Sequence, residues 1–110
     1  MASPYQLRFE DLDGWESPSP GVRQKRLQVG EVALRLLELK SSARHPDWCE
    51  VGHSGCVVDG ALDIEFEDET VRFEAGDGIV IPSGSEHRHR PQAVSERVRL
   101  ALVDYPDVSK

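Results

Sequence analysis

Short stretches in which apolar and polar residues alternate recur through the second half of the chain. The clearest stretch covers residues 61–67, where apolar and acidic residues alternate in the order ALDIEFE. This alternation predicts a strand with one buried face and one solvated face. Residues 70–73 follow the turn Asp68-Glu69, so residues 61–73 are expected to form a hairpin. Further strands are predicted around residues 57–58, 78–82 and 97–105.

One segment contradicts this pattern by its composition. Residues 31–40, with the sequence EVALRLLELK, are strong helix formers without a glycine or proline among them. Intrinsic propensity alone therefore predicts a helix. We nevertheless expect a strand, because the surrounding segments are short and extended and neighbouring strands override such a preference.

Glycine and proline interrupt the chain at short intervals, which is typical of an all-β sandwich or barrel. The length of 110 residues is that of one ordinary domain, so residues 1–110 are expected to form a single domain. Residues 1–21 contain several turn residues and Trp15, and are expected to form an irregular arm that packs back on the body. The last residues, from Pro106, are expected to fray.

Composition and charge narrow the class of function. The chain is 38% hydrophobic and 30% charged, which is typical of a globular protein, and it contains no long apolar run. Its net charge of −7 argues against nucleic acid or an acidic membrane surface as a partner. The N-terminus shows no signal-peptide pattern, so a cytoplasmic location and reduced Cys49 and Cys56 are expected.

Residues able to bind a metal ion lie in two short segments, HPDWCEVGH at 45–53 and GSEHRH at 84–89. Asp47 and Cys49 are two apart and would share one face of an extended strand. His53 follows after a turn at Gly52, and His87 follows a turn of its own. One carboxylate, one thiolate and two imidazoles form a set of four ligands that zinc accepts.

These two segments resemble the two sequence motifs of the cupin family. In the second motif Gly76, Pro82, Gly84 and His87 match the family at every position. In the first motif the residues are changed: counting back from its final glycine, Gly60, the spacing matches but the ligand types do not. The resemblance covers residues 31–104 and implies an all-β double-stranded β-helix, that is, a jelly-roll barrel with one divalent metal ion in its pocket.

Carried over residue by residue, the resemblance places Asp47 and Cys49 where the family has two histidines, and His53 where it has glutamate. With His87 from the second motif, these residues are the predicted metal ligands. Thiolate and imidazole favour zinc; Asp47, His53 and His87 alone would form the two-histidine, one-carboxylate set of non-haem iron(II) sites, which is the alternative.

The other candidate residues in the two segments are expected to lie outside the ligand set. His45 and His89 are expected on the surface, although each shares the alternation of a predicted ligand and could reach the pocket. Cys56 should face away from the pocket and pack as a small apolar residue. Trp48 should pack outside the barrel or at an interface.

Such a barrel supports two classes of function, because fold alone does not name a reaction. The first is a metalloenzyme that acts on a small organic molecule. The alternative is a non-catalytic module that binds a metal or small ligand for sensing or storage. We also expect a homodimer, in which the arm at residues 5–21 covers exposed strand edges.

Overall fold

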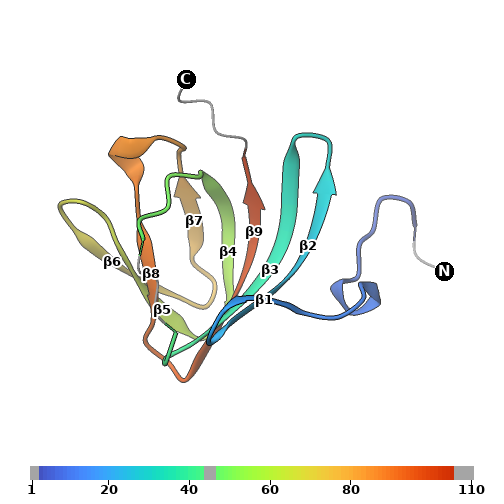
Figure 1. Ribbon diagram of the computed structural model, residues 1–110, viewed down its shortest axis with the longest axis horizontal. Coiled ribbons are helices and arrows are strands. Elements are labelled where there is room, and N and C mark those ends of the chain that lie inside the picture. The colour runs from blue at the N-terminus through green and yellow to red at the C-terminus, as the bar shows by residue number, and fades with distance from the viewer. Residues whose placement is uncertain (1–2, 44–46, 106–110) are drawn as a thin grey trace.

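The computed structural model describes residues 3–43 and 47–105, and is built almost wholly of antiparallel strands (Figure 1). One sheet has six strands in the order β1-β2-β3-β9-β4-β7. Their bounds are β1 Glu16–Ser19, β2 Val22–Val29, β3 Val32–Lys40, β9 Arg97–Asp104, β4 His53–Asp59 and β7 Gly78–Ile81. A second sheet has the order β6-β5-β8, with β6 Thr70–Glu74, β5 Ala61–Glu65 and β8 Arg90–Ala93. Two 3-10 turns, η1 Phe9–Asp11 and η2 Ser85–His87, are the helical elements of the described residues.

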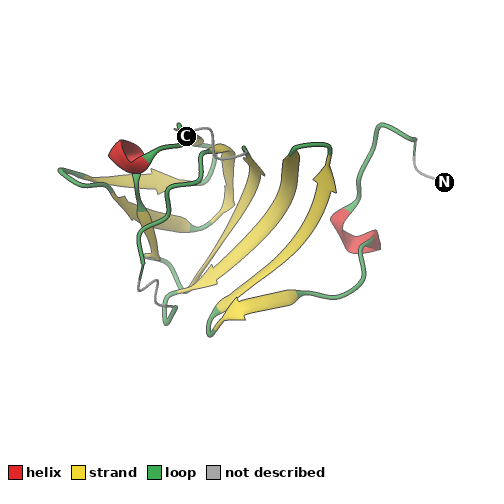
Figure 2. Ribbon diagram, turned by 45° about the horizontal axis from the view of Figure 1, so that its top comes forward, coloured by secondary structure: helices red, strands yellow, loops and turns green. Residues whose placement is uncertain are grey.

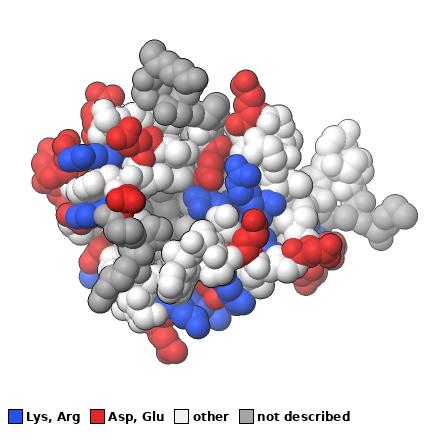
Figure 3. Space-filling view, viewed as in Figure 1, with Lys and Arg blue, Asp and Glu red and all other residues white. Residues whose placement is uncertain are grey.

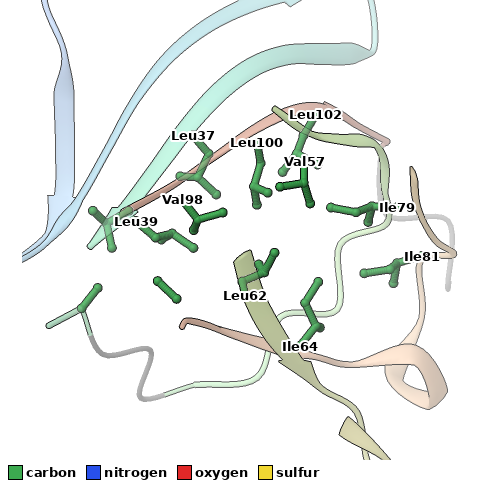
Figure 4. Packing of buried hydrophobic residues seen from close by; sticks show 13 residues of the cluster. Leu37, Leu39, Val57, Leu62, Ile64, Ile79, Ile81, Val98, Leu100 and Leu102 are labelled. Carbon is green, nitrogen blue, oxygen red and sulfur yellow. The ribbon is translucent and has the colours of Figure 1, made fainter. Parts of the chain in front are cut away.

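The two sheets face each other and enclose the hydrophobic core (Figures 2 and 4). Alternate residues of each strand point inward, as the alternation of the sequence requires. In β5, Leu62 and Ile64 are buried while their neighbours are partly exposed. The largest fully buried side chains are Leu39, Val57, Leu62, Ile79 and Val98. The predicted all-β barrel is therefore confirmed.

β3 shows how neighbouring strands override helix propensity. It pairs with β2 along Val29↔Val32 to Val22↔Leu39, and with β9 from Ala33↔Asp104 to Lys40↔Arg97. Both edges of its backbone are thus hydrogen-bonded to other strands. Burial of alternate side chains such as Leu37 and Leu39 stabilises the strand by more than the small intrinsic preference for helix.

The N-terminal arm contains a strand that the sequence did not predict. Glu16–Ser19 forms β1 and pairs with β2 at the edge of the larger sheet. An edge strand tolerates Pro18, since the missing N–H is not needed on the outer side. Before it, η1 is tied to β2 by Lys25 Nζ, which donates to the Phe9 carbonyl at 3.0 Å. Tyr5, in contrast, is 97% exposed, so the beginning of the arm does not pack on the body.

A buried acid lies on the face of the larger sheet opposite the core. Glu38 is 2% exposed and accepts hydrogen bonds from Arg23 Nε and Arg99 Nε, both at 2.8 Å. Trp15 covers this group, with the Arg23 guanidinium 4.1 Å from its ring centroid. Burial by itself would raise the pKa of Glu38, but the two arginines outweigh it and hold the pKa below the usual value.

This lowered pKa predicts a specific loss of stability in acid. The folded protein favours ionised Glu38. The contribution of Glu38 to the unfolding free energy is therefore complete above the ordinary glutamate pKa of about 4.3, and is lost as the pH falls through the lower pKa that Glu38 has in the folded protein. We expect Glu38→Gln to reduce the dependence of unfolding free energy on pH below about 4.3, as measured by urea unfolding. Glu96→Gln, on an exposed turn, controls for the removal of one charge. Equal pH dependence in Glu38→Gln and the parent protein would contradict the assignment.

Candidate metal site

Cys49, His53 and His89 form a compact cluster at one end of the barrel. Their ligand atoms all lie within 4.8 Å of one another. His53 begins β4, Cys49 lies in the loop before it, and His89 directly precedes β8 of the other sheet. Cys49 Sγ is 3.7 Å from His53 Nε2, and the two imidazole rings meet edge to face with centroids 5.0 Å apart.

The orientation of His53 is fixed by the register of the larger sheet. His53 and Asp104 are directly opposite across β4 and β9, so their side chains lie on the same face. His53 Nδ1 and Asp104 Oδ1 are 2.7 Å apart, and Arg35 Nη2 donates to the same oxygen at 3.1 Å. Nδ1 is therefore the protonated nitrogen that donates to the carboxylate, and Nε2 faces the cluster.

Burial would lower the pKa of His53, but the hydrogen bonds to Asp104 and Cys49 outweigh it and raise the pKa above the usual value. Burial would likewise raise the pKa of Asp104, and its contacts with His53 and Arg35 lower it instead. Asp104 and Arg35 are thus an ionised pair in the folded protein. This pair holds the imidazole of His53 in one orientation.

A short β-bridge aligns the other two members of the cluster. Cys49 N–H donates to the His89 carbonyl at 2.9 Å, and His89 N–H donates to the Cys49 carbonyl at 3.0 Å. His89 Nδ1 lies 3.0 Å from the carbonyl oxygen of His87, which can only accept, so Nδ1 carries the proton. Its Nε2 is buried, has no hydrogen-bond partner among the described residues, and belongs to the cluster.

The thiol of Cys49 is activated by its two neighbours. The neighbouring imidazoles of His53 and His89 lower the pKa of Cys49 to about 6, although partial burial works in the opposite direction. At neutral pH the cluster therefore presents a thiolate beside the Nε2 atoms of two imidazoles. Low-pKa thiolates of this kind are metal ligands and nucleophiles.

The predicted ligands Asp47 and His87 lie outside this cluster. Asp47 is exposed. His87 ends η2, its side chain is 42% exposed, and its Nε2 lies 3.9 Å from a carboxylate oxygen of Glu86. The structure therefore brings together Cys49 and His53 from the predicted set and adds His89. His45 lies outside the described residues.

The two remaining sequence expectations concern Cys56 and Trp48. Cys56 lies on β4 and is exposed, so it faces away from the cluster but does not pack as an apolar residue. Trp48 lies outside the core, against the guanidinium groups of Arg88 at 4.8 Å and Arg90 at 4.2 Å. These arginines also pair with Glu67 in the β5–β6 turn and with Glu65 at the end of β5.

The stacking of Trp48 positions two members of the cluster. Trp48 precedes Cys49 in the chain, and Arg88 and Arg90 flank His89. The cation–π contacts therefore hold the Cys49 loop against the segment that carries His89, beside the β-bridge. Contacts of this kind contribute about 0.5–2 kcal/mol each.

We expect Trp48→Ala to weaken zinc binding by roughly tenfold, within the range of 10–100-fold found when outer partners of metal ligands are lost. The measurement is a competition titration against a chromophoric chelator. Trp15→Ala is the matched control, because Trp15 also stacks on arginine but does so over Glu38, away from the cluster. Equal loss in the two variants would mean that general destabilisation, and not ligand positioning, is responsible.

The donor set fits zinc. Both histidines donate through Nδ1 to fixed oxygen acceptors, so in the neutral imidazole the lone pair that a metal needs is on Nε2. One thiolate and two imidazoles are ligands typical of zinc, and three protein ligands leave one position open. Bound zinc would act as a Lewis acid at that position, with Asp104 and the His87 carbonyl orienting its ligands.

A cavity of about 140 Å³ adjoins the cluster. Arg35, Cys49, His53 and His89 form its polar side, and the rest of the wall is apolar.

A larger open depression of about 790 Å³ lies around Arg23, Lys40 and Arg97, but acidic and basic side chains line it in equal number, so it selects neither sign of ligand charge. Basic side chains also gather in the middle of the face shown in Figure 3, with acidic ones around it.

A family model described as a cupin domain matches residues 35–103, which is more than half of the chain. The chain belongs to the cupin family. The predicted resemblance is thereby confirmed, and the cluster lies in the matched region of a cupin barrel. Among the described residues, this cupin has no helix with the length and apolar character needed to cross a membrane.

One curated relative and two solved cupin-like structures illustrate the similarity. The anti-sigma-E factor ChrR of Cereibacter sphaeroides is 35% identical over 100 residues, which are 90% of this chain and 45% of ChrR. The chain thus spans less than half the length of that relative. KdgF from Halomonas sp. is 24% identical with a TM-score of 0.71, and covers 84% of this chain and 86% of its own. The cupin domain of Cnp3 from Schizosaccharomyces pombe is 15% identical with a TM-score of 0.73, over 94% of this chain and 70% of its own. These two structures bear on the fold alone.

Proposed function

We propose that this cupin is a non-catalytic sensory module that binds one divalent metal ion through Cys49, His53 and His89. Zinc is the proposed ion, and iron(II) the alternative. The observation that carries the proposal is the cluster itself, in which a thiolate and two correctly oriented Nε2 atoms lie within 4.8 Å. The buried Nε2 of His89, which lacks a partner among the described residues, supports a bound ion that would satisfy it.

Two observations favour sensing over catalysis. The cavity of about 140 Å³ is well below the roughly 300–1,000 Å³ typical of pockets for drug-sized organic molecules. The curated relative ChrR is an anti-sigma-E factor, which is a protein that acts on a protein partner. We therefore propose that the binding of the metal ion in the barrel is signalled to a protein partner. This proposal replaces the metalloenzyme activity expected from the sequence alone.

The metal content of protein purified without a histidine tag tests this proposal. We expect close to one zinc ion per chain by elemental analysis, or one iron ion where zinc is scarce. Cys49→Ser should shift preference away from zinc, because a hydroxyl is a harder and weaker ligand than a thiolate. Failure to bind either ion after reconstitution with both would refute the metal site. Steady turnover of a small organic substrate by the loaded protein would favour the enzyme over the sensor.

We also propose that the module works in the cytoplasm as a homodimer. A reducing compartment would keep Cys49 available as a ligand. The outer face of the larger sheet supports pairing, since Val58 is 53% and Val80 81% exposed there, next to the exposed Cys56. Light scattering of the purified chain should give twice the monomer mass, and a monomer would contradict the pairing.

A further inference from the structure

One buried polar atom of an arginine that lines the cavity plays no part in the metal cluster. Arg35 extends from β3 into the space between the sheets and lines the cavity. Its Nη1 donates to Gln24 Oε1 at 3.2 Å and its Nη2 donates to Asp104 Oδ1 at 3.1 Å. Its Nε–H is buried and has no partner among the described residues. A guanidinium N–H can only donate, so this group requires an acceptor.

The rest of the cavity wall indicates the kind of molecule that would carry this acceptor. The apolar part of the wall includes Leu37, Ile64, Ile79, Ile81, Leu100 and Leu102. At about 30 Å³ per water molecule in the liquid, the cavity volume holds roughly five waters, so a short aliphatic chain would fill it. The wall thus fits a small molecule with a polar head and an apolar tail.

The charges around the cavity determine the sign of that head. Arg35 and Asp104 are an ionised pair of opposite sign. A divalent ion with the Cys49 thiolate would leave one positive charge, because coordination keeps the thiol deprotonated. One negative charge on the ligand would balance the site. A dianion such as phosphate would exceed this balance and would press further acceptors against the aliphatic wall, where they have no donors.

We propose that the cavity binds a short aliphatic monocarboxylate, whose head group accepts from Arg35 Nε–H beside the Cys49, His53 and His89 cluster. The aliphatic tail packs against the isoleucine and leucine wall. This inference rests on the proposed metal site, and it names the class of small molecule that the sensory module detects. Arg35 then has two roles: Nη2 fixes Asp104 behind His53, and Nε recognises the ligand.

Cobalt(II) in place of zinc provides the test, because thiolate-bound cobalt absorbs visible light. The full chain is loaded with cobalt, and the spectrum is recorded before and during titration with butyrate. We expect a saturable change in the cobalt bands with butyrate and no change with butyramide, which has the same shape but no charge. If cobalt gives no thiolate spectrum, the metal site itself fails. If it gives one that butyrate leaves unaltered, the metal site stands and the carboxylate proposal is overturned.

Arg35→Lys separates the two roles of the arginine. Lysine keeps the positive charge beside Asp104 but lacks the second donor at Nε. We expect the cobalt spectrum to persist and the butyrate affinity to fall by about tenfold or more, the value of one hydrogen bond to a charged group. Unchanged butyrate affinity in this variant would overturn the assignment of Arg35 as the carboxylate donor. The comparison of butyrate with butyramide in the parent protein decides the proposal if the variant does not fold.

Discussion

Replacing His89 with alanine is expected to abolish metal binding, whereas replacing His87 with alanine should leave it nearly intact. In the proposed site His89 supplies one of three ligand atoms, and its loss leaves two ligands that cannot define a tetrahedral site. The affinity should fall by more than the roughly 10–100-fold that loss of an outer partner produces. The measurement is a zinc competition titration with the parent protein, His53→Ala, His89→Ala and His87→Ala.

His87 is a strict control because it is the same residue type two positions away. It touches the site only through its backbone carbonyl, which alanine retains. The side chain is 42% exposed, so truncation should also cost little stability. If His87→Ala lost the ion and His89→Ala retained it, the ligand set would be that of the family motif, with Asp47, Cys49, His53 and His87, and the cluster described above would not be the metal site.

Of the substitutions considered for their effect on stability, truncation of Leu62 should produce the largest loss. Leu62 lies in β5 at 0% exposure, at the centre of the contact between the two sheets (Figure 4). Leu62→Ala removes buried methyl groups and leaves a cavity, which typically costs about 2–5 kcal/mol. A domain of this size has a total stability of about 5–15 kcal/mol. We therefore expect a large fall in the urea midpoint and in Tm, of roughly 4–8 °C for each kcal/mol.

The control for this change is Val80→Ala. Val80 lies in β7, points to the outer face and is 81% exposed. Its truncation should change the unfolding free energy by no more than about 0.5 kcal/mol. A similar loss in both variants would indicate that the outer face is covered in solution, as it would be in a dimer.

Much of the fold could be predicted from the sequence, because apolar and polar residues alternate along strands that have one buried face. The hairpin at residues 61–73 and the strands β7 and β9 lie within a few residues of their predicted positions. β1, β2 and β8 were not predicted. β2 carries polar side chains on both faces, with Arg23 bound to Glu38 on one and Gln24 bound to Arg35 on the other, and β8 contains a proline, so neither shows alternation.

The candidate site was less accessible to sequence reasoning for a specific geometric reason. The spacing of the second motif assigns His87, and the alternation of an extended strand would put His87 and His89 on the same side. The chain instead makes a 3-10 turn at Ser85–His87 and leaves it at Arg88, one residue before the bridge between His89 and Cys49. A turn was predicted before His87, but nothing in the sequence GSEHRH indicates that the turn includes His87 itself. The partners Asp104 and Arg35 depend on register across strands distant in sequence, which no local pattern contains.

The cluster joins the two sheets at one mouth of the barrel. His53 begins a strand of the larger sheet and His89 leads into a strand of the smaller one, while the β4–β5 and β8–β9 connections lie at the opposite end. A bound ion would therefore act as a cross-link between the sheets, and its binding energy would become part of the local stability of that mouth. Loss of the ion would let the mouth open locally while the far end stays closed, with faster amide exchange in β8 than in β3. Occupancy of a buried site would in this way be converted into a change in the flexibility of an exposed rim, which a partner protein can detect without entering the barrel.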